Sequence, residues 1–382
     1  MKILSPSYMI AVALGLHVVV PHHGALVPLT PKEQAIKGVL LRLVRREDEA
    51  IVSRNHHQLS SVFVLPMATT ALRHAEERQA FLDAWSRGRK LTLQKVHVSL
   101  RTPGITFLSP NRVQIFAVVS ERYRYQYNQS RTSDEFGLGI RHDYLLTQHL
   151  GHWRIAGDDF TDPLDQDTRV SGSSANPEIS SRLPGHPPLI HLSSGEAKAV
   201  MYADHYCGAA PGCQNQGHYN PRYNNFNGEG GDCTNFVSQA LLAGGFQETP
   251  EWNYDRRTGD GSRAWSNARG LFDFLMRSGR ATIFGKGRFA GVTQPSPQFP
   301  HGPIAAIRPG DLISYVEHGR AVHTAIVVGF DSQGVPVVDS HTSDRYHVPW
   351  DLGWDHSTYY YLWHVHYPHA NTEDEHSIAN PR

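Results

Sequence analysis

Three long stretches in the first half of the chain alternate apolar and polar residues. They span 91–101, 112–127 and 137–148, and a short stretch of the same kind spans 152–158. Period-two alternation buries one face of a strand and leaves the other face polar, which is typical of half-buried antiparallel strands. The pattern therefore predicts an antiparallel sheet, and it restricts this half of the chain to folds built around such a sheet.

Two helices are expected before these strands, over 31–54 and 68–88. Pro31 lies in the first turn of the first helix, and apolar residues recur there at intervals of three and four. Helices followed by a run of strands indicate an α+β domain over 30–160. The order is compatible with a cystatin-like or NTF2-like module, an analogy of fold that carries no function.

The length of 382 residues permits two or three domains. Residues 161–193 are rich in Asp, Ser, Pro and Gly without periodicity, which predicts a linker. Residues 9–20 form an apolar run of twelve residues, which suits a signal peptide within 1–25 and is too short to span a bilayer. We therefore expect a secreted or cell-envelope protein without a membrane span, ending in a polar tail over 369–382.

The net charge bears on binding partners. The 36 Lys and Arg residues balance the 36 Asp and Glu residues. A chain with no net charge lacks the basic footprint of a nucleic-acid-binding protein. We therefore expect no nucleic-acid partner, and composition leaves the oligomeric state open.

A second domain is expected over 194–368, with helices first and an antiparallel sheet after them. Helices are predicted over 195–206, 232–243 and 266–278, and strands over 311–315, 323–330, 335–341 and 359–367. The four residues 331–334 suit a hairpin turn. In such a hairpin, pairing Phe330 with Val335 places His323 opposite Thr342.

Cys233 is the first candidate catalytic residue. It begins a predicted helix and follows a glycine-rich approach, GEGGDC. A helix N-terminus carries partial positive charge and unpaired N–H groups, which favour a thiolate and can stabilise an oxyanion. The alternative is a small residue buried in a packed helix. The preceding Asp232 is a good N-cap, and Asp232, Tyr223 and Asn224 are the candidate oxyanion or substrate-binding residues, although they equally suit a role in shaping the loop.

His323 is the candidate general base, because it stands at the mouth of a strongly apolar strand. A third group is expected to orient its other ring nitrogen. Asp339 and His341 share one face of the next strand and are both candidates, with His341 the nearer. For each of them the alternative is a polar residue satisfied at a strand end.

Several segments of 195–367 together resemble the bacterial amidase domain family. They are YADHYC, YNPRYNNFNGEGGDCTNFVSQALLAGG, RAWSNARGLFDFL, RPGDLISY, HTAIVVGF and DSHTSD. This family is related to the CHAP and NlpC-type cysteine peptidases of papain-like fold. The resemblance implies a papain-like α+β core, with Cys233 as nucleophile, His323 as general base, and His341 or Asp339 as the orienting residue.

The sequence departs from the family by an insertion, CGAAPGCQNQG, which holds the other two cysteines. In an exported protein Cys207 and Cys213 are expected to close a small disulfide loop, leaving Cys233 as the lone thiol; the alternative is two free thiols. No metal site or cofactor is predicted, because neither an HExxH nor a CxxC motif supports the spacing of His341, Asp344 and His347.

The expected function is therefore an exported cysteine amidase or peptidase that hydrolyses an amide bond, perhaps in a peptide of the cell wall. Two alternatives stay open. One is a catalytically silent module that binds wall polymer or peptide, and the other is a papain-like acyl transferase in which an amine replaces water as acceptor.

Overall fold

The computed structural model describes residues 28–160, 186–354 and 357–368. The expected signal peptide, most of the expected linker and the polar tail lie outside the described residues. Among the described residues, no helix is both long enough and apolar enough to cross a bilayer.

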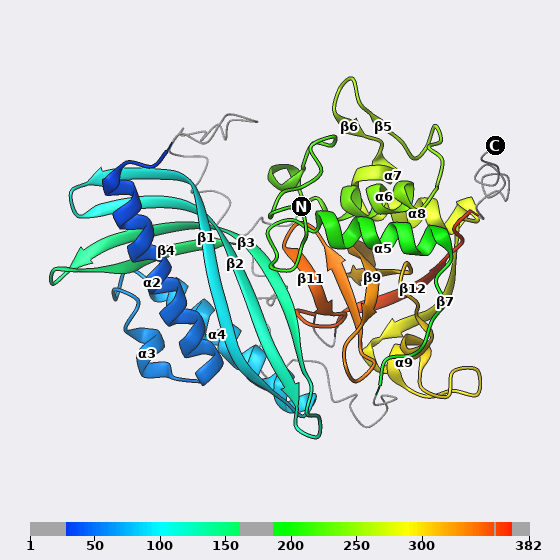
Figure 1. Ribbon diagram of the computed structural model, residues 1–382, viewed down its shortest axis with the longest axis horizontal. Helices are drawn as coiled ribbons and strands as arrows, with labels where there is room; N and C mark the ends of the chain where they lie inside the picture. The colour runs from blue at the N-terminus through cyan, green and yellow to red at the C-terminus, as the bar shows by residue number, and fades with distance from the viewer. Residues whose placement is uncertain (1–27, 161–185, 355–356, 369–382) are drawn as a thin grey trace, which may run out of the picture.

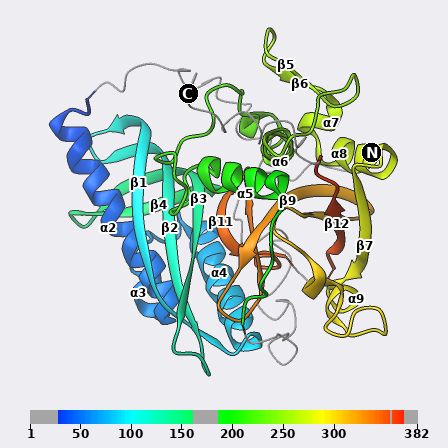
Figure 2. The same ribbon diagram turned by 45° about the vertical axis from the view of Figure 1, so that its right-hand side comes forward.

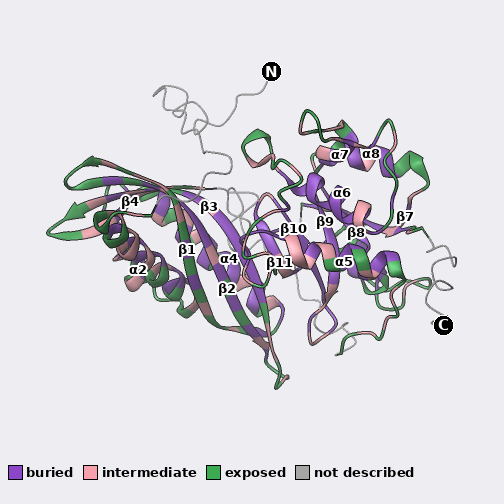
Figure 3. Cartoon of the chain, turned by 45° about the horizontal axis from the view of Figure 1, so that its top comes forward, coloured by how far each residue is buried: buried purple, intermediate pink, exposed green. Residues whose placement is uncertain are grey.

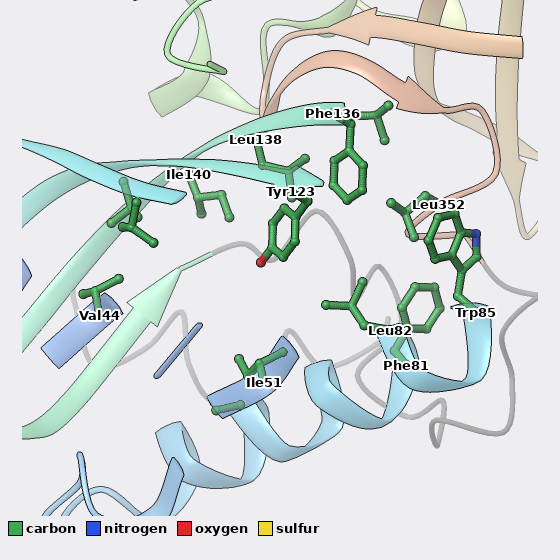
Figure 4. Packing of buried hydrophobic residues seen from close by; sticks show 14 of the residues in the cluster. Val44, Ile51, Phe81, Leu82, Trp85, Tyr123, Phe136, Leu138, Ile140 and Leu352 are labelled. Atoms are coloured by element: carbon green, nitrogen blue, oxygen red, sulfur yellow. The ribbon is translucent and has the colours of Figure 1, made fainter. Parts of the chain in front are cut away.

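The N-terminal helices begin and end close to their predicted bounds. Helix α2 (Pro31–Ser53) starts at a capping box, in which the Thr30 hydroxyl accepts from the Glu33 N–H and the Glu33 carboxylate accepts from the Thr30 N–H. A short helix, α3 (His56–Ser60), separates it from α4 (Thr69–Gly88). Both long helices turn one apolar stripe toward the strands (Figure 4).

The four strands that follow are paired antiparallel in chain order. They are β1 (Leu91–Ser109), β2 (Arg112–Tyr127), β3 (Ser133–His149) and β4 (His152–Phe160). In β2 the residues that alternate inward, from Val113 to Tyr127, are almost completely buried against the helices. The alternation in the sequence therefore marked the strands correctly, and the mixed helical and antiparallel class is confirmed.

The C-terminal half has its helices first, as predicted. Helix α5 (Ser194–Tyr206) precedes a long loop, and α6 (Cys233–Ala243) follows it. The remaining elements are η4 (Asn227–Glu229), β5 (Tyr254–Asp255), β6 (Asp260–Gly261), α7 (Arg263–Ser266), α8 (Ala268–Ser278), β7 (Ala281–Arg288), α9 (Phe289–Thr293), η5 (Pro303–Ala306), β8 (Leu312–Glu317), β9 (Arg320–Phe330), β10 (Pro336–Ser340), β11 (Asp344–Pro349) and β12 (Tyr359–Val365).

The two halves share one sheet. Its order among the described residues is β1-β2-β3-β11-β10-β9-β8-β12-β7, and β4 pairs with β3 over 142–149, beyond the stretch that pairs with β11. Figure 1 shows the two halves side by side, joined where β3 meets β11. There Gly139 pairs with Asp344, and a Cβ atom on Gly139 would lie 2.7 Å from the Ala209 backbone. The strand pairing and this close approach bind the N-terminal half to the loop after α5.

The sheet separates two apolar clusters. The larger cluster contains residues of both halves, such as Trp85 of α4 and Trp350 beyond β11. The smaller one lies under α5, α6 and α8 and contains Phe236 together with Ile326 and Trp363 of the sheet. Figures 2 and 3 show α5 and α6 lying across the strands on this second face, where buried positions dominate. The two halves are therefore not independent cores linked by a tether.

Candidate active site

Helix α6 is held in place by a wholly apolar face. Phe236, Val237, Ala240 and Leu241 are completely buried in the smaller cluster. Cys233 is therefore the first residue of a helix that cannot shift without losing core contacts. The side chain of Asp232 does not cap this helix. It accepts instead from the Phe226 N–H at 2.8 Å and the Asn235 amide at 2.9 Å, which corrects the expected N-cap role.

Thr342 takes the capping role that was expected of Asp232. Its hydroxyl oxygen accepts from the N–H groups of Asp232 at 2.8 Å and Cys233 at 3.2 Å. Gly231 lies beside it with φ at 118°, and a Cβ atom there would lie 2.8 Å from the Thr342 hydroxyl. The sequence placed Thr342 opposite His323 in a hairpin, but its contact with the start of α6 was not predicted, because more than a hundred residues separate the two in the chain.

The Cys233 thiol is nearly enclosed, with 8 % of the residue exposed. Its sulfur lies 3.7 Å from the Thr234 hydroxyl. Burial raises the pKa of the Cys233 thiol from its usual 9.0, and hydrogen bonds from the Thr324 backbone and the Thr234 hydroxyl only partly oppose this effect. In this arrangement the residue is a neutral thiol at neutral pH.

The thiol is therefore expected to react slowly with iodoacetamide at pH 7, with a rate that still rises above pH 9. A raised pKa leaves about 1% thiolate or less at neutral pH. Mass spectrometry of the native protein along a pH series measures this rate, and Cys233→Ala serves as the control that takes up no label. Complete labelling at pH 6 to 7 with a flat pH profile would contradict the buried neutral thiol.

A cavity of about 470 Å³ opens beside Cys233. Gly230, Gly231 and Thr234 form the wall near the sulfur, and Glu229 and Asp260 stand at exposed positions of its rim. Phe226, Gly261, Ser266, Asn267, Ala268, Ala321 and Val322 complete the lining. The lining contains two carboxylates and no Lys, Arg or His, so the cavity presents negative charge beside an enclosed thiol.

His323 does not meet Cys233. It pairs across the sheet with Tyr315, and its ring centroid lies 5.6 Å from that of Tyr315 and 5.5 Å from that of Trp354, in the larger apolar cluster. The next residue, Thr324, faces α6 instead. No hydrogen bond joins the His323 ring to the Cys233 sulfur in the described part of the chain, and His323 Nε2 is buried without a hydrogen-bond partner.

The electrostatics of His323 follow from this position. The pKa of His323 is lowered to about 3. Burial is the larger cause, and the nearby Arg345 guanidinium is the smaller one. The predicted hairpin register holds only in part. Next to the turn Phe330 pairs with Pro336 instead of Val335, but after a shift between Val337 and Val338 the pair of Asp339 with Ile326 follows the predicted register. Strand β10 ends at Ser340, before this pairing reaches His323.

His341 lies on the same side of the sheet as Cys233 but binds other groups. Its Nδ1 lies 2.6 Å from a carboxylate oxygen of Asp232, and its Nε2 donates to the Tyr206 carbonyl at 2.7 Å. The ring is stacked between Tyr219 and Phe236, with centroids 3.7 and 4.1 Å away. Because both ring nitrogens are engaged, His341 does not orient His323 here.

Asp339 lies on the same face as His341, as the spacing of two indicated, but it too is remote from His323. It is completely buried, and one carboxylate oxygen accepts from the His347 N–H at 2.8 Å. The Asp339 carboxyl group lies in a cluster with Asp204 and His347. Neither candidate for the third catalytic position therefore contacts the candidate base.

The two loop candidates shape the approach to α6. Tyr223 packs against the rings of Tyr254 and Trp265. The Asn224 amide donates to the Gly259 carbonyl, and the Asn224 carbonyl accepts from Asn235. These contacts agree with the alternative reading, in which the two residues form the loop.

The site is linked to the N-terminal half through a buried carboxylate. Asp344 contacts the Tyr219 hydroxyl, the Ala209 N–H at 2.8 Å and the Arg141 guanidinium of β3 at 3.4 Å. Tyr219 in turn stacks on His341. The insertion that carries Ala209 is closed by a disulfide between Cys207 and Cys213, and Cys233 is the free cysteine.

Residues 193–363 match the model of a family described as "Putative amidase domain". The match covers less than half of the chain, and it supports a hydrolytic, amidase-like function for the C-terminal half. No curated protein matches the chain.

Similar solved structures include a type 2 hexachlorocyclohexane dehydrochlorinase (LinA), at 9% identity and TM-score 0.24 over 34% of this chain and 85% of that one. A domain of unknown function with a cystatin-like fold from Nostoc punctiforme has 12% identity and TM-score 0.23 over 35% of this chain and 78% of that one. The intermembrane space region of the chloroplast protein ARC6 has 13% identity and TM-score 0.25 over 35% and 98%.

Proposed function

We propose that the C-terminal domain is a papain-like, cysteine-dependent hydrolase of amide bonds with Cys233 as its nucleophile. The observation that carries the proposal is the place of the free thiol: Cys233 is the first residue of α6 and lines a cavity bordered by three glycines. A sulfur at a helix N-terminus faces the dipole and the N–H groups that stabilise developing negative charge.

The reaction follows from this placement. The sulfur attacks the amide carbonyl carbon, the C–N bond breaks, and the amine leaves with the proton that the thiol gave up. A thioester with Cys233 remains. Water then attacks the thioester carbonyl, which releases the acid and returns the proton to the sulfur.

In this mechanism His323 accepts the proton of the Cys233 thiol. Its Nε2 is the ring nitrogen that lacks a partner, whereas both nitrogens of His341 are engaged. Reaching the sulfur requires the ring to leave the larger cluster. This end of β9 is where the register with β8 shifts, between Tyr315 and Val316, so the strand is least regular where the movement has to occur.

The proposed substrate is a peptide with a free amino group, such as a cell-wall peptide, and the proposed location is outside the cytoplasm. Glu229 and Asp260 at the cavity rim complement a cationic group. The disulfide between Cys207 and Cys213 is typical of an oxidising compartment, which supports export.

Replacing Cys233 by alanine is expected to abolish hydrolysis and leave the fold intact, because the change removes only the sulfur. Mass spectrometry of purified cell wall and of a peptide library after incubation measures the products, and circular dichroism checks the fold. Products with an added amine instead of water would indicate acyl transfer. Unchanged turnover in Cys233→Ala would exclude Cys233 as nucleophile.

Two histidine variants test the proton acceptor. His323→Gln is expected to lower kcat at least about 100-fold, in the range of a lost general base. Wild-type kcat in this variant would remove His323 from the mechanism. The kcat of His323→Gln is compared with that of His341→Gln. The second variant disturbs the hydrogen bond to Asp232, on the side of the sheet where Cys233 lies.

A second candidate function is a catalytically silent module that holds peptide or wall polymer in the same cavity. The absence of a hydrogen bond between Cys233 and His323 in the described residues favours it. Binding of wall fragments that is equal in wild type and Cys233→Ala, without product from either, would establish this function and overturn hydrolysis.

A further inference from the structure

Three side chains that can act as metal ligands lie close together at the end of α5, away from Cys233. Asp204 comes from α5, Asp339 from β10 and His347 from β11. One possible ligand atom of each lies within 4.8 Å of the others. Figure 3 shows α5 lying beside β10 and β11, so the chain brings the three together only in the folded protein.

The contacts within this cluster are short and oriented. His347 Nε2 lies 2.9 Å from Asp204 Oδ1. The His347 N–H donates to Asp339 Oδ1 at 2.8 Å, which fixes the carboxylate and leaves Oδ2 as its remaining oxygen. Carboxylates that act as metal ligands are commonly oriented by a hydrogen bond of this kind.

Asp339 Oδ2 is the observation that points to a ligand. Asp339 is completely buried, and no N–H or O–H group of the described residues reaches this oxygen. The Asp339 carboxyl group lies beside Asp204 and His347, with one possible ligand atom of each residue within 4.8 Å of the others. A buried carboxylate oxygen without a donor is costly, and a cation placed between the two carboxylates removes the cost.

We propose that Asp204, Asp339 and His347 bind one divalent transition cation, of which Zn²⁺ is the best representative. Two carboxylate oxygens and one imidazole nitrogen suit a borderline metal, and ligand bonds of about 2.0–2.2 Å place tetrahedral ligands about 3.4 Å apart. The observed separations reach that arrangement with small side-chain movements.

The site has access to solvent. The side chains of His347 and Asp204 are 34% and 23% exposed, which provides an entry path. Three protein ligands leave a fourth tetrahedral position for water. The bound cation would tie α5 to two strands beside the disulfide loop, independently of any chemistry at Cys233.

The test uses the full chain, stripped with a chelator and dialysed against Zn²⁺, with metal content measured by elemental mass spectrometry. About one Zn²⁺ per chain is expected. It is also expected to raise Tm by about 5 °C at a hundredfold excess over Kd. Mg²⁺ and Mn²⁺ are titrated in parallel; tighter binding of Mg²⁺ than of Zn²⁺ would overturn the assignment.

Two ligand variants and one matched control locate the site. Asp339→Asn keeps the shape of the buried side chain, and Asp204→Asn changes a partly exposed one, so loss of binding in both is not a folding defect. Each is expected to weaken Zn²⁺ binding by more than the roughly 10–100-fold caused by losing an outer ligand partner.

The control is His366→Gln, which removes one ring of the neighbouring pair His364 and His366, whose centroids lie 5.9 Å apart. It is expected to bind Zn²⁺ as wild type does. Wild-type affinity in both Asp variants, no Zn²⁺ bound to wild type, or loss of binding in His366→Gln would each overturn the proposal.

Discussion

Asp232→Ala is expected to destabilise the protein by about 3–5 kcal/mol, because it removes a buried side chain that a buried ring and two N–H groups share as their hydrogen-bond partner. The carboxylate and the His341 ring are each about 1% exposed and lie 2.6 Å apart. Without Asp232, the imidazole keeps only its bond to the Tyr206 carbonyl. The Phe226 N–H and the Asn235 amide lose their acceptor as well.

The effect should extend to function, because these same bonds hold the start of α6. Denaturant unfolding measures the stability, and turnover of wall peptides measures the function. Glu135→Ala is the matched control, since Glu135 is an exposed acid of β3 that does not line the cavity. A change of less than about 1 kcal/mol for Asp232→Ala would show that the pair does not support the site.

Asp351→Ala is expected to cost a similar 3–5 kcal/mol, for a different part of the molecule. Arg89, at the end of α4, forms an ion pair with Asp351, and the two side chains are 1% and 0% exposed. The guanidinium also lies 5.4 Å from the centre of the Phe289 ring. Removing the carboxylate therefore leaves a cation with one partner fewer in the core that the two halves share.

Thermal and denaturant unfolding measure this loss, with Glu251→Ala as control. Glu251 pairs with Arg277 at the surface, where both side chains are more than half exposed, and should contribute less than about 1 kcal/mol. The double variant Arg89→Met with Asp351→Leu should recover most of the stability, because neither charge is then buried. Equal stability of Asp351→Ala and wild type would contradict a structural role for this pair.

Several features of this protein could be predicted from short stretches of sequence. Helices α2 and α4, strands β2, β3 and β4 and the start of α6 at Cys233 agree with prediction within a few residues, whereas β1 continues from its expected end at 101 to Ser109. Each depends on a local cause: a capping box, a period of two, or a change to an apolar helical face. The proximity of Cys207 and Cys213 could also be predicted, because the two residues are close in the sequence.

The partners of the side chains could not be predicted, because they come from distant segments. In the apolar strand of His323, both faces are buried, so its periodicity does not tell which face meets α6. Beyond Val338 the register with β10 is the predicted one, so the facing of His323 was decided by how the whole sheet packs and not by this pairing. The contact of Asp232 with His341 and the capping of α6 by Thr342 could not be predicted either, because each joins distant segments of the chain.

The sequence by itself determined the α+β class, the place of the thiol at a helix N-terminus and the order of elements. The tertiary structure alone decided that β3 pairs with β11, so that one sheet joins the halves, and that His323 faces the larger cluster. It also brought Asp204, Asp339 and His347 together. The reason is that local pattern sets backbone period and burial, whereas register and long-range contacts depend on how the whole core packs.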